Sequence, residues 1–175
     1  MGTNTYALLF LALSSLILLL QVGLLLLQLQ RERKNGRPPL HVLSGVRVSQ
    51  VMNETPAVSP KDTLEAVQEI MFAREAFALP VLDEDGELVG LVSMSDVTQI
   101  ERSERSRVQV GAVYSRDVKY AFPDQTMHEV VERMRELHLA NFPVVSRRDE
   151  KQLLGMVTKA DIMLAYKKMA LDLSC

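Results

Sequence analysis

The sequence lacks tryptophan, has a single cysteine and is poor in aromatic residues, which make up 5% of the chain. One cysteine cannot form a disulfide within the chain, and this usage is typical of a reducing compartment. A glycine-rich phosphate loop, a nucleophile elbow and a cluster of Cys and His ligands are also missing. The segment 128–132 resembles a zinc-protease helix only briefly, since Glu132 stands where the second histidine is required. We therefore predict neither an enzymatic activity nor a metal site.

An excess of positive charge is missing as well, because the chain has a formal net charge of −2. Four basic residues and one acidic residue gather at 31–37, and their net charge of +3 leaves −5 for the rest of the chain. The mixed-sign segment 101–107 contains no aromatic residue and is interpreted as a solvated connector. A nucleic-acid partner would need a basic face, so we exclude this class of partner.

One long hydrophobic run is present near the N-terminus. The 24 residues from Tyr6 to Leu29 contain no charged side chain. As an α-helix this run would span roughly 36 Å, enough to cross a hydrocarbon core of about 30 Å. A cleaved signal peptide and a buried core helix are the alternatives, but no basic residue precedes the run and it is too long for an ordinary signal sequence. We predict a single-pass transmembrane helix over 6–29, preceded by a short tail over 1–5.

The flanks of this run predict its orientation. Arg31, Arg33, Lys34 and Arg37 follow it, whereas residues 1–5 carry no basic side chain, so the positive-inside rule places the C-terminal domain in the cytoplasm. The same basic residues suit the anionic headgroups of a lipid bilayer, which is an expected partner. Turn formers at 35–39 stop a helix from continuing, and we predict a basic, proline-containing linker over 30–44.

The remainder of the sequence contains an internal repeat. The segments 46–52 and 108–114 match at an offset of 62 residues, and the motifs at 90–96 and 155–161 match at an offset of 65. Between them, Thr63, Val67, Glu69, Met71, Pro80 and Val81 recur at an offset of 63 as Thr126, Val130, Glu132, Met134, Pro143 and Val144. Offsets that only increase along the chain indicate insertions in loops. We assign repeat 1 to 45–101, a connector to 102–107, repeat 2 to 108–168 and a C-terminal tail to 169–175.

Each copy has the pattern strand, helix, strand, strand, helix, which predicts a mixed α/β (α+β) fold. Thr126 and Glu129 form a predicted capping box ahead of an apolar stripe at helical spacing. Two short apolar runs, at 78–82 and 88–92, are joined by Asp85-Gly86, which is typical of a β-hairpin. A copy of about 60 residues buries too small a core to be stable alone, so we expect the two copies to pack sheet to sheet as a pseudo-two-fold pair.

The soluble part, over residues 45–168, resembles the tandem cystathionine-beta-synthase (CBS) domain pair, also called a Bateman module. The matching motifs are Val51-Met52, Leu79-Pro80-Val81, Phe142-Pro143-Val144, the segment 90–96 (GLVSMSD) and the segment 155–161 (GMVTKAD). Repeat 2 departs from the family pattern, with Val113-Tyr114 in place of Val-Met and Asp117-Val118 in place of Thr-Pro. The resemblance implies a homodimer.

The Ser/Thr-x-x-Asp motif of each copy comes where a strand gives way to a helix. The free N–H groups and positive dipole end of a helix suit a phosphate, and a carboxylate can accept hydrogen bonds from two ribose hydroxyls. The resemblance implies an adenosine nucleotide at Ser93 and Asp96 and another at Thr158 and Asp161. It implies that each base lies between the first strand of the same copy and the next strand. The residues concerned are Thr55, Val58, Ala78, Leu79 and Pro80 in repeat 1, and Asp117, Tyr120, Asn141, Phe142 and Pro143 in repeat 2.

Simpler interpretations stay open for these residues. Ser93 and Thr158 are also ordinary N-caps with an aspartate in the favourable first turn, a role that needs no ligand. Lys159 is expected to lie beside the second site and Tyr120 to offer it a stacking face. The alternatives are that Lys159 is solvated and that Tyr120 fills the core between the sheets.

We therefore expect a membrane-anchored cytoplasmic CBS pair that binds AMP, ADP, ATP or S-adenosylmethionine as a regulatory ligand and requires no cofactor. It would signal through a conformational or dimer change, limited by the ligand's different affinities for the two states. The alternative from another class is a regulatory subunit or tail of an ion channel or transporter, chloride-channel-like or specific for magnesium or an osmolyte. A third is a ligand-free dimerisation module.

Overall fold

The computed structural model of the chain describes residues 40–172, with side chains over 43–166. The predicted tail (1–5), the predicted transmembrane helix (6–29) and residues 30–39 of the predicted linker lie outside the described residues. Among the residues that are described, no helix is both long enough and apolar enough to cross a membrane.

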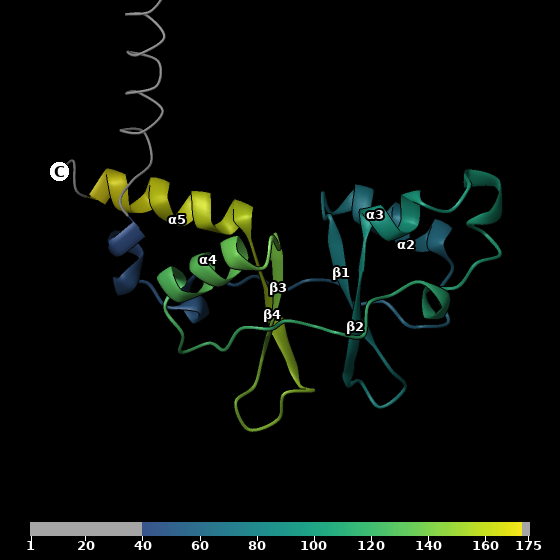
Figure 1. The fold of residues 1–175 in the computed structure, drawn as a ribbon, viewed down its shortest axis with the longest axis horizontal. Helices are drawn as coiled ribbons and strands as arrows, with labels where there is room; N and C mark the ends of the chain where they lie inside the picture. Colours follow the sequence, from purple (N-terminus) through teal and green to yellow (C-terminus); the bar gives the residue numbers. More distant parts are fainter. Residues whose placement is uncertain (1–39, 173–175) are drawn as a thin grey trace, which may run out of the picture. The chain divides into compact units, whose positions relative to one another are not determined.

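Both repeats contain a helix, a β-hairpin and a second helix (Figure 1). Repeat 1 has α2 (Leu64–Ala73), β1 (Ala78–Leu82), β2 (Leu88–Ser93) and α3 (Met94–Thr98). Repeat 2 has α4 (Met127–Glu136), β3 (Asn141–Val145), β4 (Leu153–Thr158) and α5 (Lys159–Asp172). Short 3-10 helices precede them: η1 (Leu40–Gly45), η2 (Val48–Gln50), η3 (Arg102–Glu104) and η4 (Val110–Ala112). This order confirms the predicted mixed α/β fold.

The first helix of each repeat begins at a threonine cap and buries one apolar stripe. The Thr126 hydroxyl accepts from the Glu129 N–H at 3.3 Å, and a Glu129 carboxylate oxygen accepts from the Thr126 N–H at 2.8 Å, which confirms the predicted capping box. The buried stripes are Leu64, Val67 and Met71 in α2, and Met127, Val130 and Met134 in α4. Just after these helices, Glu75 and His138 have φ values of 51° and 54°, a left-handed turn that leads the chain into β1 and β3.

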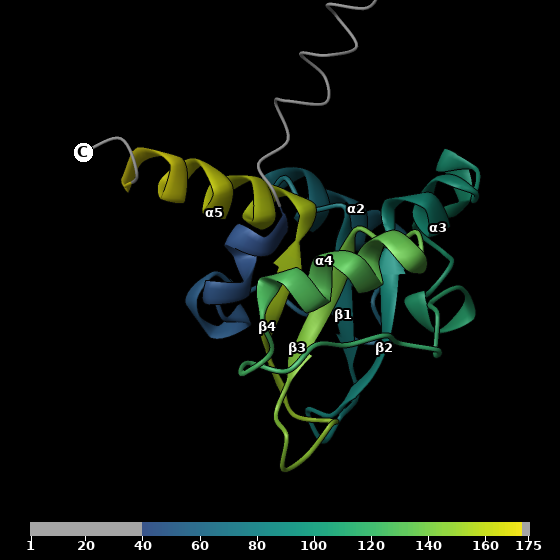
Figure 2. The ribbon, with the colours of Figure 1, turned by 60° about the vertical axis from the view of Figure 1, so that its left-hand side comes forward.

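Each hairpin pairs its two strands antiparallel, β1 with β2 and β3 with β4. The loop of the first hairpin contains Gly86 at φ 77°, and the Asp83 carboxylate accepts from the N–H groups of Asp85 and Glu87 at 3.0 and 2.9 Å. The predicted Asp85-Gly86 hairpin is therefore confirmed. At their far ends the hairpins touch, since the Leu88 N–H donates to the Lys151 carbonyl at 2.7 Å. Figure 2 shows the two hairpin loops extending toward the same end of the molecule.

The predicted first strand of each repeat is reduced to a single β-bridge. Val58 forms a single parallel bridge to Val81, and Ala121 forms one to Val144. The Val58 N–H donates to the Pro80 carbonyl at 3.0 Å, but Pro80 has no N–H to continue this ladder on the same side. Pro143 accepts from the Ala121 N–H in the same way, at 2.9 Å. A proline in the central strand thus limits the third strand to one bridge.

The segments that lead into the two repeats are exchanged between them. We call residues 46–53 leader 1 and residues 108–115 leader 2. Val48 of leader 1 is fully buried in the core of repeat 2, whereas Val110 of leader 2 is fully buried in the core of repeat 1. Asn53 bridges Met156 in β4, and Ser115 bridges Leu91 in β2. Each leader therefore completes the other repeat before its chain crosses back.

The motif glycines allow this close approach. A Cβ atom on Gly90 would lie 2.0 Å from the Tyr114 ring and 2.7 Å from the Ser115 carbonyl oxygen of leader 2. On Gly155 it would lie 2.7 Å from the Asn53 carbonyl oxygen of leader 1. Any side chain at these positions would push a leader off its strand.

Several segment boundaries differ from those predicted. Leu43, in the predicted linker, is fully buried against repeat 2, so residues 40–44 belong to the folded unit. Within the predicted connector, Arg105 donates to the Ile100 carbonyl at 2.9 Å and to the Gln68 side chain at 3.0 Å, which ties it to α2. The helix α5 continues through 169–172, beyond the predicted end of repeat 2. Its counterpart α3 has only five residues.

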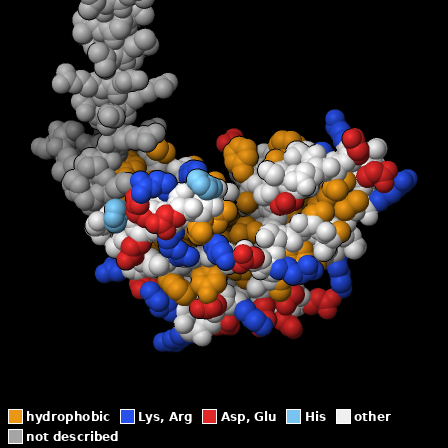
Figure 3. Space-filling view, in the orientation of Figure 1, with side chains coloured by type: hydrophobic (Ala, Val, Ile, Leu, Met, Phe, Trp, Pro, Cys, Tyr) orange, Lys and Arg blue, Asp and Glu red, His pale blue; other side chains and the backbone are white. Residues whose placement is uncertain are grey.

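The helices lie to the outside of the two hairpins, with α4 and α5 over one hairpin and α2 and α3 over the other (Figure 1). Two separate hydrophobic clusters follow from this arrangement, one in each repeat. On the face shown in Figure 3, charged side chains are spread among hydrophobic ones, and a notch separates the upper parts of the repeats.

Candidate functional site

Both Ser/Thr-x-x-Asp motifs form capping boxes where a strand ends and a helix begins. In repeat 1, one Asp96 oxygen, Oδ2, accepts from the Ser93 N–H at 2.7 Å and from its hydroxyl at 2.6 Å. In repeat 2, Asp161 Oδ2 accepts from the Thr158 N–H and hydroxyl, both at 2.7 Å. The simple capping role considered from the sequence is therefore present in both copies, and it occupies one oxygen of each carboxylate.

The two copies differ at the second oxygen of the aspartate carboxylate, Oδ1. Asp161 Oδ1 accepts a hydrogen bond of 2.7 Å from the side-chain amide of Asn53, which belongs to leader 1. The other amide hydrogen of Asn53 points to the Val51 carbonyl at 3.3 Å. One carboxylate oxygen can accept two hydrogen bonds, so Asp161 Oδ1 keeps room for one further donor, such as a ribose hydroxyl.

A cavity of about 410 Å³ opens beside Asp161, between the two repeats. This volume lies in the range of 300–1,000 Å³ that is typical of small-molecule sites. The walls come from leader 1 and the residues after it, from the turn between α2 and β1, and from β3, β4 and the start of α5. The lining residues are Asn53, Glu54, Thr55, Arg74, Glu75, Ala76, Phe77, Ala78, Ala140, Asn141, Met156, Thr158, Lys159, Ala160 and Asp161.

The cavity gathers predicted site residues from both repeats. Those that line it are Thr55, Ala78, Asn141, Thr158, Lys159 and Asp161. The sequence instead predicts Thr55 and Ala78 beside the Ser93 motif of their own copy. Because leader 1 pairs with β4, the chain brings Thr55 to the Thr158 motif of the other copy.

Other predicted site residues lie in the strands and the core. Leu79 and Phe142 are fully buried, and Val58 is 4% exposed where it bridges β1. Pro80 and Pro143 are buried in the middle of their strands. None of these five residues lines the cavity beside Asp161. They shape the strands that form its walls.

The remaining predicted residues lie outside this cavity. Ser93 and Asp96 form the cap of α3, and Asp117 pairs with Lys119 at 2.5 Å. Tyr120 lines a separate hollow of about 270 Å³ with Val118, Lys119, Phe122 and Arg133. Its hydroxyl donates to Glu150, and this hydrogen bond, helped by burial, raises the pKa of Tyr120 above its usual value. Tyr120 therefore does not provide a stacking face for a ligand at Asp161.

Sequence reasoning missed five polar or aromatic residues of the cavity. They are Asn53, Glu54, Arg74, Glu75 and Phe77. Phe77 is 74% exposed, although it is large and apolar, and it lies on the wall that repeat 1 contributes. The signal in the sequence was an aromatic residue just before an apolar run. The contribution of Asn53 was not, because it depends on the exchange of the leaders.

Comparison with known proteins identifies the family to which this chain belongs. The model of the family described as "CBS domain" matches the chain twice, over residues 48–102 and 110–168. An inosine-5'-monophosphate dehydrogenase of Methanocaldococcus jannaschii is 32% identical over 117 residues, which is 67% of this chain but 23% of that protein. A homoserine O-acetyltransferase of Methanosarcina acetivorans is 30% identical over 127 residues, 72% of this chain and again 23% of the relative. The chain thus spans about a quarter of the length of these curated relatives.

Solved structures share the fold. The CBS domain pair of protein MJ0100, in complex with 5'-methylthioadenosine and S-adenosyl-L-methionine, has a TM-score of 0.61 at 21% identity and covers 71% of this chain and 98% of its own. The structure of CBSX2 in complex with AMP has a TM-score of 0.62 at 19% identity, over 72% and 99% of the two chains. The CBS domain of a CBS domain containing membrane protein from Sphaerobacter thermophilus has a TM-score of 0.58 at 21% identity, over 79% and 96%.

The two family matches cover both repeats, and the solved structures share the arrangement of hairpins and helices that the repeats adopt. The predicted resemblance is confirmed: this chain belongs to the CBS domain family and contains a tandem CBS pair.

Proposed function

We propose that this chain is a regulatory module that binds an adenosine nucleotide in the cavity beside Asp161 and performs no catalytic step itself. One observation carries the proposal: the Thr158–Asp161 cap, Thr55 and Asn141 all line the same cavity of about 410 Å³. The adenosine ligands in the structures of the MJ0100 pair and of CBSX2 support it. Asp161 Oδ1 is the expected acceptor for a ribose hydroxyl, and the first turn of α5 suits a phosphate.

A thermal denaturation experiment tests this proposal. The full chain, purified in a mild detergent, is melted with AMP, ATP, S-adenosylmethionine or no ligand. A ligand at a hundredfold excess over its Kd stabilises the folded state by about 2.7 kcal/mol and must raise Tm. Unchanged melting with all three ligands at millimolar concentration contradicts the proposal.

A pair of matched variants locates the site. Asp161→Ala removes the cap of α5 and the proposed ribose acceptor, whereas Asp96→Ala removes the equivalent cap of α3. Both variants should lose some stability through the lost cap. Asp161→Ala alone should abolish the ligand-dependent rise in Tm. If both variants keep it, the ligand lies elsewhere.

We also propose that residues 6–29 anchor the module as a single-pass helix with the CBS pair in the cytoplasm. The uncharged run and the basic residues after it support this topology. One structural neighbour is the CBS domain of a membrane protein. The full chain should stay with the membrane fraction after an alkaline carbonate wash, and a variant without residues 1–29 should not. Release of the full chain by the wash contradicts the anchor.

A second copy of the chain is the proposed partner, through which ligand binding would be signalled. Large hydrophobic side chains left exposed on helices of both repeats support this assembly: Phe72 is 66%, Met163 59% and Leu164 67% exposed. Light scattering after size-exclusion chromatography should give the mass of a dimer. If the chain instead regulates a channel or transporter, it should co-purify with a protein that crosses the membrane several times.

A further inference from the structure

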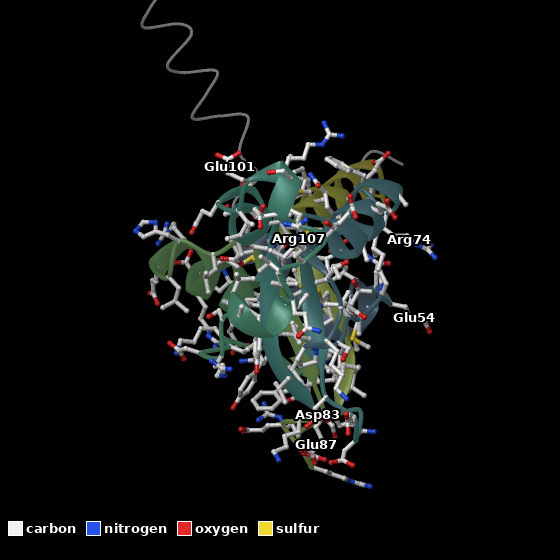
Figure 4. The ribbon with its side chains drawn as sticks, turned by 90° about the vertical axis from the view of Figure 1, so that its right-hand side faces the viewer. Glu54, Arg74, Asp83, Glu87, Glu101 and Arg107 are labelled. Atoms are coloured by element: carbon white, nitrogen blue, oxygen red, sulfur yellow. The ribbon has the colours of Figure 1, made fainter. Side chains whose placement is uncertain are left out.

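Two cationic side chains line the cavity beside Asp161, one from each repeat. Arg74 caps the end of α2 in repeat 1, and Lys159 is the first residue of α5 in repeat 2. Both residues are exposed, and neither forms an ion pair with any side chain that the structure describes. In Figure 4 the Arg74 side chain extends outward on the same side of the molecule as Glu54, another residue of the cavity.

Three acidic residues also line the cavity: Glu54, Glu75 and Asp161. Asp161 already accepts three hydrogen bonds, from Thr158 and Asn53. Glu54 belongs to the segment that crosses from leader 1 to the first strand, and Figure 4 shows it well below Arg74. Glu75, the third, follows Arg74 in the chain. A guanidinium, an ammonium and the free N–H groups at the start of α5 are each groups that suit a phosphate.

The repeat provides an internal comparison for this pair of cations. The 63-residue offset places Leu137 at the end of α4, where repeat 1 has Arg74. The 65-residue offset places Met94 at the start of α3, where repeat 2 has Lys159. Two apolar side chains therefore stand at the positions of the repeat that correspond to the two cations. Arg116, the residue after leader 2, stacks on the Tyr114 ring at 4.7 Å.

We infer that the chain takes one phosphorylated adenosine, in the Asp161 cavity, with the phosphate held between Arg74 and Lys159, and that the Asp96 side holds no phosphate. This inference rests on the proposed function and adds the ligand class to it. The same two cations oppose the sulfonium charge of S-adenosylmethionine and give no gain to an uncharged nucleoside. AMP should therefore bind more tightly than adenosine, 5'-methylthioadenosine or S-adenosylmethionine, at one molecule per chain.

Isothermal titration calorimetry on the full chain in detergent tests the inference, with AMP and adenosine as paired probes. Arg74→Ala and Lys159→Ala should each weaken AMP binding about tenfold or more, since each removes a hydrogen bond to a charged group. Neither variant should change the Kd for adenosine. Arg107→Ala, an exposed arginine outside the cavity that Figure 4 also labels, is the control and should leave both ligands unaffected.

A gain-of-function variant completes the test. The double substitution Met94→Lys with Leu137→Arg copies the two cations to the Asp96 side, and it should raise the number of AMP molecules bound per chain from one to two. Two AMP molecules on the unaltered chain, or an equal loss of AMP and adenosine in the Arg74 and Lys159 variants, would overturn the inference. Adenosine and AMP binding with the same Kd would overturn it but leave the proposed function intact. Absence of binding by both ligands refutes the proposed function, and the inference with it.

Discussion

The side-chain amide of Asn53 donates a hydrogen bond of 2.7 Å to the carboxylate of Asp161, which lies 108 residues further along the chain. Ser115 occupies the matching place beside the other motif, because it bridges Leu91 as Asn53 bridges Met156. A serine side chain is shorter than an asparagine, and among the described residues no bond from Ser115 to Asp96 is formed. The two halves of the pair are therefore alike in backbone and different in this contact.

Replacing Asn53 should reveal this difference as a change in stability. Asn53→Ala removes a hydrogen bond to a charged group at an exposed site, and we expect the free energy of unfolding to fall by about 0.5–1 kcal/mol. Ser115→Ala is the matched control and should change it by less. Urea denaturation of the full chain in detergent measures both values. Equal losses in the two variants would show that the contact adds nothing.

The glycines under the leaders should tolerate no side chain. Gly90→Ala and Gly155→Ala each place a methyl group within 3 Å of backbone oxygen atoms of a leader, and overpacking of this kind costs about 1–3 kcal/mol. Gly45→Ala is the control, because a Cβ atom there meets nothing within 4 Å. Denaturant midpoints for the three variants check this expectation. A stable Gly90→Ala or Gly155→Ala variant would mean that the leaders do not pack on the strands as described.

The core of repeat 2 depends on one aromatic residue. Phe142 is fully buried in β3, and Phe142→Ala should lower the free energy of unfolding by about 3–5 kcal/mol through lost burial and the cavity left behind. Phe72→Ala is the matched control, since Phe72 is 66% exposed, and it should cost far less. Urea unfolding followed by circular dichroism compares them. A similar cost for both would argue that Phe72 is covered in solution, as in a dimer.

One surface ion pair should respond to pH. Arg147 donates two hydrogen bonds to the Asp124 carboxylate, at 2.7 and 2.9 Å, and these lower the pKa of Asp124 below its usual value. A folded-state pKa below the unfolded value means that the pair stabilises the fold above the unfolded pKa, and that this contribution disappears as the pH falls through the folded pKa.

Carboxyl NMR titration measures this pKa directly. Arg147→Ala should return the pKa of Asp124 toward its usual value, and high salt should weaken the shift because the pair is exposed. Arg148→Ala removes a neighbouring exposed arginine that forms no ion pair among the described residues, so it should leave the pKa unchanged. An unchanged pKa in Arg147→Ala would contradict the assigned cause.

Local signals in the sequence predicted most of the elements. The caps at Thr126 and Thr158, the apolar stripe of α4, and the Asp85-Gly86 hairpin depend on residues within a few positions of each other. Such contacts are fixed by side-chain chemistry at short range, so spacing alone could indicate them. The predicted first strands form only single bridges, because Pro80 and Pro143 act on a neighbouring segment.

The composition of the site could be predicted only in part. Thr158 and Asp161 were identified because their motif is local, but their neighbours Asn53 and Arg74 come from the other repeat. Assigning each predicted site residue to the motif of its own copy assumed that each leader packs on its own repeat. No local pattern distinguishes a leader that packs on its own repeat from one that packs on the other, since Val48 and Val110 are equally apolar in either arrangement.

The exchange of the leaders has a consequence for how the chain can be divided. A cut in the connector at 102–107 would leave each fragment holding the leader that completes the other one. Two such fragments, expressed together, should bind each other as if they were subunits of a heterodimer, whereas either fragment alone has an uncovered strand and an unfilled core. For the same reason, a substitution in one copy can alter the walls of a cavity that the other copy helps to form, so the boundary between the repeats in the sequence is not a boundary between independent structural units.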